Sequence, residues 1–286
     1  MASTDVRALY AEHSRRWQDN RFVYPVISRR SRGLSIGINL NPDQGCNFDC
    51  VYCSVDRTTP STVRTVDESA LTVELDDLIA LATSGKLWEW PPFDATPAPL
   101  RRINDVAFSG DGEPTAYPGF SRMCAVAAGA LDGCGLTEVK TVVITNATLL
   151  DRPAVESGLS ILDARPSEIW AKLDAGSEAW YATIERSKVP LAKVLANLRE
   201  CGRRRPLVIQ SLFLRWQGAE AGAAEYDAWA TRLAWLLDQG ARITRVQVYT
   251  TARATAEPAA TALEPAILEG IADRARRLGL TAEVFP

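Results

Sequence analysis

The sequence predicts an α/β fold: a partial (β/α)6 TIM-like barrel, with a parallel sheet and its helices outside. From Gly33 onward, short apolar and β-branched runs alternate with longer stretches of helical periodicity, which is typical of successive βαβ units. Six strand–helix units can be recognised in this rhythm, and eight would close a full barrel. We therefore expect a partly open sheet whose gap admits a substrate.

The expected elements follow in chain order. Strands are predicted at residues 34–40, 103–109, 141–145, 168–173, 207–213 and 245–250, with a short tail strand at 282–285. The helix expected at 72–84 is followed by Gly85, a natural stop. Later helices are indicated by apolar stripes that contain Phe120, Cys124 and Ala127; Val194, Leu195 and Leu198; Trp229, Leu233 and Leu236; and Ile267 and Ile271.

Composition limits the class of protein. The 286 residues are 47% hydrophobic and 23% charged, and no apolar run is long enough to cross a membrane. Residues 1–32 are polar and arginine-rich, with a short helix expected at 6–17, and they lack the apolar segment of a secretory signal. We expect a cytoplasmic protein with an N-terminal extension, residues 1–32, and one barrel domain, residues 33–286.

The first strand leads directly into three thiols, Cys46, Cys50 and Cys53. The next cysteine is Cys124 and the only histidine is His13, so a four-ligand zinc site cannot be completed locally. An iron–sulfur cluster with one open iron needs only three thiolates, and barrel enzymes place their chemistry at the carboxyl ends of strands. A disulfide, a zinc loop with a distant ligand and an electron-transfer cluster with a remote fourth cysteine remain as alternatives.

Polar residues also follow the later strands. Gly110-Asp111-Gly112-Glu113-Pro114 ends the second strand, where glycines let the backbone approach a ligand. Asn146 and Ser211 have side chains suited to ribose hydroxyls, although capping or loop hydrogen bonds explain them equally well. Lys172 and Asp174 share one strand face, where they form either an ion pair or a contact with cofactor or substrate.

The CxxxCxxC spacing, with Tyr52 before the last cysteine, resembles the signature of the radical SAM family. The resemblance implies that Cys46, Cys50 and Cys53 bind a [4Fe-4S] cluster, whose open iron binds S-adenosylmethionine, and that Tyr52 packs near the adenine. The glycine loop is similar to the family's GGEP motif, with its first two glycines split by Asp111. By this resemblance the cofactor-binding residues are Ser109, Gly110, Asp111, Gly112 and Glu113. Asn146 and Ser211, from their side-chain chemistry, and Tyr249, from its place at the end of the sixth strand, are further candidates.

Residues 28–286 together resemble one radical SAM subgroup, which includes the enzymes that build the wyosine base in tRNA. The resemblance implies cleavage of S-adenosylmethionine to a 5′-deoxyadenosyl radical, with electrons from a donor such as flavodoxin or ferredoxin. Those wyosine enzymes carry a second cluster on preceding cysteines, and here none precedes Cys46. The lack of these cysteines and the net charge of −3 favour a small-molecule or peptide substrate, and tRNA stays the alternative. Candidate substrate contacts are Lys172, Asp174, Arg215 and Arg253, of which the first two are the candidate catalytic residues.

Overall fold

The computed structural model describes residues 9–10 and 17–286, and most of the helix expected at 6–17 lies outside them. The chain forms two compact units. Unit 1 contains the described residues up to Gly45, Ser61–Val143 and Ala154–Ser167, and unit 2 contains Cys46–Pro60, Ile144–Pro153 and Glu168–Pro286. Among the described residues, no helix combines the length and apolar character that a membrane span requires.

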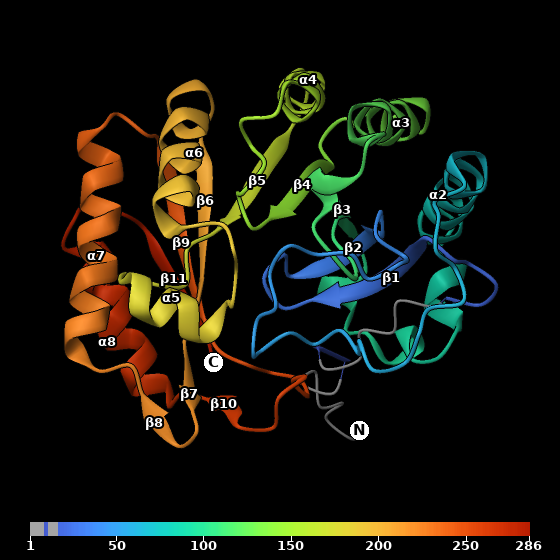
Figure 1. Ribbon diagram of the computed structural model, residues 1–286. Helices are drawn as coiled ribbons and strands as arrows, with labels where there is room; N and C mark the ends of the chain where they lie inside the picture. The colour runs from blue at the N-terminus through green and yellow to red at the C-terminus, as the bar shows by residue number, and fades with distance from the viewer. Residues whose placement is uncertain (1–8, 11–16) are drawn as a thin grey trace. The chain divides into compact units, whose positions relative to one another are not determined.

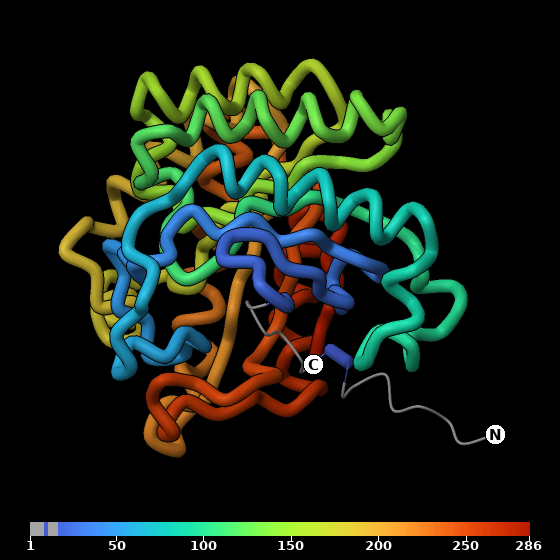
Figure 2. Tube along the Cα trace, turned by 90° about the vertical axis from the view of Figure 1, so that its right-hand side faces the viewer, coloured from blue at the N-terminus to red at the C-terminus, as the bar shows by residue number. Residues whose placement is uncertain are grey.

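Unit 1 is a layer of strands with helices beside it. Its strands follow the order β1 (Val23–Ser28), β2 (Gly33–Ile38), β3 (Ile103–Phe108) and the first residues of β4 (Lys140–Thr145). β1 is antiparallel to β2, and the other neighbours are parallel. Three helices lie side by side along these strands in Figure 2: α2 (Glu68–Thr83), α3 (Phe120–Gly133) and α4 (Pro153–Leu162). Short 3-10 turns are η1 (Lys86–Glu89), η2 (Phe93–Ala95), η3 (Ala98–Leu100) and η4 (Pro114–Ala116).

Unit 2 continues from the last residues of β4 through β5 (Ser167–Lys172), β6 (Leu207–Leu212), β9 (Ile243–Tyr249) and β11 (Ala282–Phe285). From β5 onward these neighbours pair in parallel. Its helices are α5 (Glu178–Ile184), α6 (Leu191–Arg204), α7 (Ala223–Asp238) and α8 (Pro265–Arg276), as Figure 1 shows. A separate antiparallel sheet has the order β10 (Ala260–Ala262), β7 (Leu214–Trp216), β8 (Ala219–Glu220).

The predicted fold class, a partial TIM-like barrel with helices outside a largely parallel sheet, is confirmed. The six predicted strands correspond to β2, β3, β4, β5, β6 and β9, and the tail strand to β11. Gly85 follows α2 with a φ of +82°, in the left-handed region where glycine is favoured. Cys124 is fully buried on α3, as its place in the apolar stripe predicts.

The strand β1 was not predicted, because it lies within residues 1–32, where the sequence indicated only an extension. Its run contains Pro25, which argues against a central strand but is tolerated at a sheet edge, where β1 lies. The carboxylate of Glu74, on α2, accepts hydrogen bonds from the amides of Arg21, Phe22 and Val23, at 3.0, 2.8 and 3.0 Å. These bonds tie the entrance of β1 to α2.

Candidate cofactor site

The cysteine loop, residues 46–53, is held in unit 2 by backbone hydrogen bonds from two distant segments. The amide of Val51 donates to the carbonyl of Ile184, at the end of α5, at 2.9 Å. The carbonyl of Cys53 accepts from the amide of Ala256 at 2.7 Å. Such bonds fix the path of the loop through main-chain atoms, so they do not depend on the side chains that a cofactor would engage.

The three thiols of this loop are half-buried, and none of the six cysteines, all within the described residues, forms a disulfide. Burial raises the pKa of Cys50 to about 12, and the nearby Lys172 offsets part of this rise. Within the described ranges, no three His, Cys, Asp or Glu side chains already converge on a metal position. Three thiols on one loop still match, in number and chemistry, an iron–sulfur cluster with one open iron, whereas closed tetrahedral zinc needs a fourth ligand.

Asn146 contacts the cysteine loop directly from the end of β4. Its amide nitrogen donates to the Asn47 side chain at 2.7 Å and lies 3.9 Å from the sulfur of Cys46, within the range of a sulfur hydrogen bond. Its oxygen accepts from the amide and the hydroxyl of Thr148, at 3.1 and 2.7 Å. These contacts make Asn146 a positioning residue for the loop, and its predicted role at a ribose stays a prediction.

Tyr52, Lys172 and Asp174 form a buried polar network beneath the cysteine loop. The Tyr52 hydroxyl donates to the Asp174 carboxylate, and Lys172 Nζ donates to that hydroxyl at 3.2 Å. Lys172 Nζ also lies 3.4 Å from Asp174 Oδ2, so the ion pair that we considered as an alternative is present. The second carboxylate oxygen accepts from the amide of Leu212 at 2.8 Å. The network therefore ties β5 and β6 to the residue before Cys53.

Glu185 completes this network from the end of α5, and the sequence analysis missed it. Its side chain is buried and lies close enough to Asp174 for the two carboxyl groups to interact, and its carbonyl accepts from the amide of Asp49 at 3.0 Å. Burial, and then the charge of Asp174, raise the pKa of Glu185 well above its usual value. Burial alone would lower the pKa of Lys172, but Asp174 and Cys50 outweigh this and hold it well above its usual value. A glutamate after a short helix carries no sequence signal of burial.

The glycine loop, residues 110–114, is packed in unit 1 against the chain that leads to Cys46. A Cβ on Gly112 would lie 1.9 Å from the carbonyl oxygen of Gly45, closer than any real contact allows. The amide of Glu113 donates to that same carbonyl at 3.2 Å. Gly45 is the last residue of its segment of unit 1 and directly precedes Cys46 in the chain.

Asn39, after β2, holds the same loop through Asp111, the residue between its two glycines. Its amide nitrogen donates to Asp111 Oδ2 at 2.7 Å, and its oxygen accepts from the amides of Asp111 and Asn41, at 3.2 and 3.0 Å. A Cβ on Gly110 would lie 2.4 Å from that oxygen. Asn39 is 3% exposed. The sequence could have indicated Asn39, because it is a polar residue between an apolar strand and the first cysteine.

The remaining predicted residues have the following surroundings. Ser211 is fully buried, and its hydroxyl donates to the carbonyl of Leu173 at 2.6 Å and accepts from Trp229 at 3.0 Å, which fits the loop-bonding alternative. Tyr249 is half-buried and packs against the apolar cluster around Val51 and Tyr52. The Ser109 hydroxyl shares a hydrogen bond with the Tyr24 hydroxyl at 3.0 Å, and the Glu113 carboxylate accepts hydrogen bonds from Thr115. Arg215 forms an ion pair with Glu220 at 2.8 Å, and Arg253 is half-buried.

Comparison with solved structures identifies the fold. A radical SAM methyltransferase from Sphaerobacter thermophilus superposes with a TM-score of 0.61 over 92% of this chain and 68% of its own, at 14% identity. The chain has the radical SAM fold. Streptococcus suis SuiB, solved with S-adenosylmethionine bound, gives a TM-score of 0.55 over 90% of this chain and 49% of its own, at 13% identity. The predicted resemblance to the radical SAM superfamily is thus confirmed at the level of the fold.

Sequence comparison adds relatives that share this region. A UPF0026 protein of Synechocystis is 29% identical over 174 residues, which are 60% of this chain and 54% of that protein. One from Helicobacter pylori is 26% identical over 140 residues, 49% of this chain and 39% of its own. A GTPase Obg of Brachyspira hyodysenteriae is 26% identical over 185 residues, 64% of this chain and 23% of its own. No protein-family model matches, and the chain spans less than two thirds of these relatives.

Proposed function

We propose that this protein is a radical SAM enzyme, with residues 33–286 as its catalytic domain. The observation that carries the proposal is a loop of three thiols, fixed by main-chain bonds, in a chain with the radical SAM fold. Cys46, Cys50 and Cys53 hold a [4Fe-4S] cluster. When bound and reduced, such a cluster would supply the one electron needed to cleave the S–C5′ bond of S-adenosylmethionine, with methionine and a 5′-deoxyadenosyl radical as the products.

The chain's own residues position these groups. Asn146 and the main-chain bonds of Val51 and Cys53 hold the cysteine loop. Asn39 holds Asp111 and so fixes the glycine loop, whose backbone is the proposed contact for the amino group of S-adenosylmethionine. The buried network under Tyr52 gives the adenine side of the proposed site a rigid support, since the Tyr52 hydroxyl is bonded to a fully buried carboxylate.

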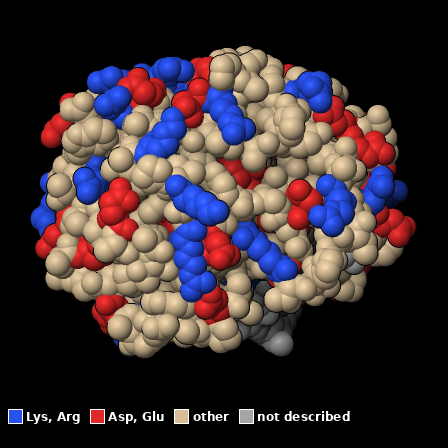
Figure 3. All heavy atoms as spheres, in the orientation of Figure 1, with Lys and Arg blue, Asp and Glu red and all other residues tan. Residues whose placement is uncertain are grey.

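We propose a small-molecule or peptide substrate rather than tRNA, with Lys172 as the contact and the fully buried Asp174 as its counter-charge. One observation favours this choice: in the arginine run 203–205, Arg205 is only 6% exposed, so the run does not present three surface cations. Arg203 is also paired with Glu200. Basic and acidic side chains are intermixed on the face shown in Figure 3. A tRNA-modifying enzyme instead needs a basic surface to neutralise several phosphates.

Anaerobic reconstitution, followed by chromatography after dithionite reduction, tests the reaction. The expected products are methionine and 5′-deoxyadenosine, formed slowly even without substrate. A fully loaded cluster that yields no deoxyadenosine would instead support a non-catalytic electron-transfer protein. Gel-shift titration with bulk tRNA at two salt concentrations tests the substrate: micromolar binding that weakens steeply with salt would favour the wyosine-type alternative. Reduction by flavodoxin or ferredoxin in place of dithionite tests the proposed electron donor.

A further inference from the structure

Two glutamines lie inside the sheet of unit 2, at positions where a parallel sheet is ordinarily apolar. Gln210 on β6 and Gln247 on β9 are register partners, and Gln210 is also the partner of Lys172 on β5. The next residue on β6, Ser211, bonds Trp229 of α7. Because side chains alternate along a strand, the two glutamines lie on the face away from α7, which is also the face of Lys172.

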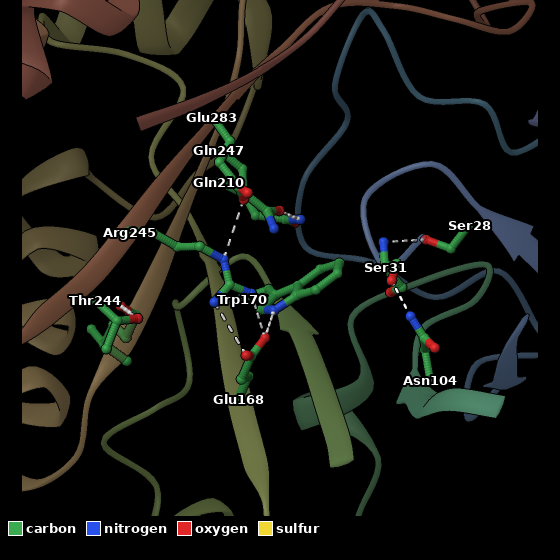
Figure 4. A network of polar contacts seen from close by, with 11 residues as sticks. Ser28, Ser31, Asn104, Glu168, Trp170, Gln210, Thr244, Arg245, Gln247 and Glu283 are labelled. Carbon is green, nitrogen blue, oxygen red and sulfur yellow. Dashed lines mark hydrogen bonds and ion pairs between the residues drawn. The ribbon is translucent and has the colours of Figure 1, made fainter. Parts of the chain in front are cut away.

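The glutamine pair, Gln210 and Gln247, has an unsatisfied donor. Gln210 Nε2 donates to Gln247 Oε1 at 2.7 Å, as Figure 4 shows. Gln210 is 2% exposed and Gln247 is fully buried. Among the described residues, no acceptor lies within hydrogen-bond reach of Gln247 Nε2. A buried donor left unpaired costs about 1–3 kcal/mol, so an acceptor bound at the Gln247 amide would recover this free energy.

The charges around the pair indicate what kind of acceptor fits. Lys172 is matched by Asp174 at 3.4 Å, and Arg245 by Glu168 at 2.7 Å and Glu283 at 3.5 Å. Figure 4 shows Arg245, with its partners Glu168 and Glu283, beside the two glutamines. Since each of these cations already has a counter-charge, a carboxylate or phosphate here would bring an uncompensated buried charge. A neutral carbonyl oxygen satisfies the amide without that cost.

We propose that the glutamine pair binds a neutral carbonyl oxygen of the substrate, one strand away from Lys172. The role as a substrate site rests on the proposed function, whereas the binding chemistry does not. This binding chemistry predicts a substrate that carries an amide, ketone or ester carbonyl, or the carbonyl of a nucleobase. A single buried water would be the competing occupant.

The test uses the cluster-loaded protein with ¹⁵N-labelled glutamine side chains and two probes of similar size, N-methylacetamide and acetate. N-methylacetamide is expected to shift the Gln247 side-chain signal saturably, and acetate is expected to leave it unchanged. Equal shifts of the Gln247 signal with both probes would overturn the proposal. No shift with either probe, which is the result expected if a water occupies the site, would overturn it as well. Deoxyadenosine formation by the same sample is measured separately, so that failure of the radical chemistry and failure of this site can be told apart.

Two variants sharpen the result. The double variant Gln210→Leu with Gln247→Leu removes donor and acceptor together, so it is expected to be at least as thermally stable as the parent and to bind N-methylacetamide at least tenfold more weakly. Gln247→Met serves the same purpose if the double variant does not fold. Thr141→Val is the matched control, because Thr141 is fully buried and its hydroxyl likewise lacks a partner within the described ranges. Unchanged probe affinity in both glutamine variants would overturn the proposal.

Discussion

The cysteine loop of unit 2 and the glycine loop of unit 1 are positioned by different means. The cysteine loop is held by hydrogen bonds to distant segments and rests on a buried network of charged and polar side chains. The glycine loop is also hydrogen-bonded, to Asn39 and Gly45, but these bonds depend on a close backbone approach that only glycine at 110 and 112 allows. The cysteine loop should therefore tolerate substitution of its own exposed side chains, whereas the glycine loop should tolerate almost no substitution of its glycines.

The largest expected effect is at the thiols. Alanine at Cys46, Cys50 or Cys53 should remove the cluster and the formation of deoxyadenosine together, since each supplies one of only three thiolates. Iron and sulfide analysis with the visible absorbance of the reconstituted protein would measure this. Alanine at Cys124, Cys134 or Cys201 should leave the cluster intact, because Cys124 and Cys201 are buried in the core and Cys134 is exposed at a helix end. Iron loss in one of these three would show a different ligand set.

Gly112→Ala comes next, and it tests the steric side of the comparison. Its Cβ would displace Gly45, which adjoins Cys46, so both the affinity for S-adenosylmethionine and the cluster yield should fall. Equilibrium dialysis with labelled cofactor and iron analysis measure the two effects. Gly129→Ala on α3 is the control, since its Cβ meets open space and alanine favours a helix by about 0.5–1 kcal/mol. Equal behaviour of both variants would rule out the close-packing account.

Asp174→Ala tests the buried network beneath the cysteine loop. It leaves Lys172 without its counter-charge and the Tyr52 hydroxyl without its acceptor, so unfolding should become easier by about 3–5 kcal/mol. Urea denaturation measures the change. The half-exposed pair Lys193–Asp151 gives the comparison: Asp151→Ala should cost about 0.2–1 kcal/mol. A loss at Asp174 no larger than this would indicate that Glu185 replaces the missing carboxylate.

The smallest expected effect is at Asn39. Asn39→Leu removes the bonds that hold Asp111, so S-adenosylmethionine should bind about tenfold more weakly, because each lost bond contributes about 0.5–1.5 kcal/mol. Iron content should stay unchanged, which separates this variant from Gly112→Ala. Asn104→Ala is the control, as its side chain bonds Ser31 at the opposite end of the strands (Figure 4). Weaker cofactor binding in both asparagine variants would point to a general loss of stability instead.

The sequence by itself determined the strands, the six-unit rhythm and the three-thiol loop. These are local signals, because strand and helix periodicity and ligand spacing are properties of consecutive residues. It did not determine β1, since an edge strand with Pro25 lacks the pattern of a central one.

Only the tertiary structure decided which polar residues meet. Glu185 contacts Asp174, Asn39 contacts Asp111 and Gln210 contacts Gln247, pairs that lie 11, 72 and 37 residues apart. No periodicity links such partners, because strand register and helix packing bring them together only after the chain has folded. The same reason kept the sequence from showing that Lys172 and Asp174 pair with each other and share the hydroxyl of Tyr52. Their contact with a ligand stays a prediction.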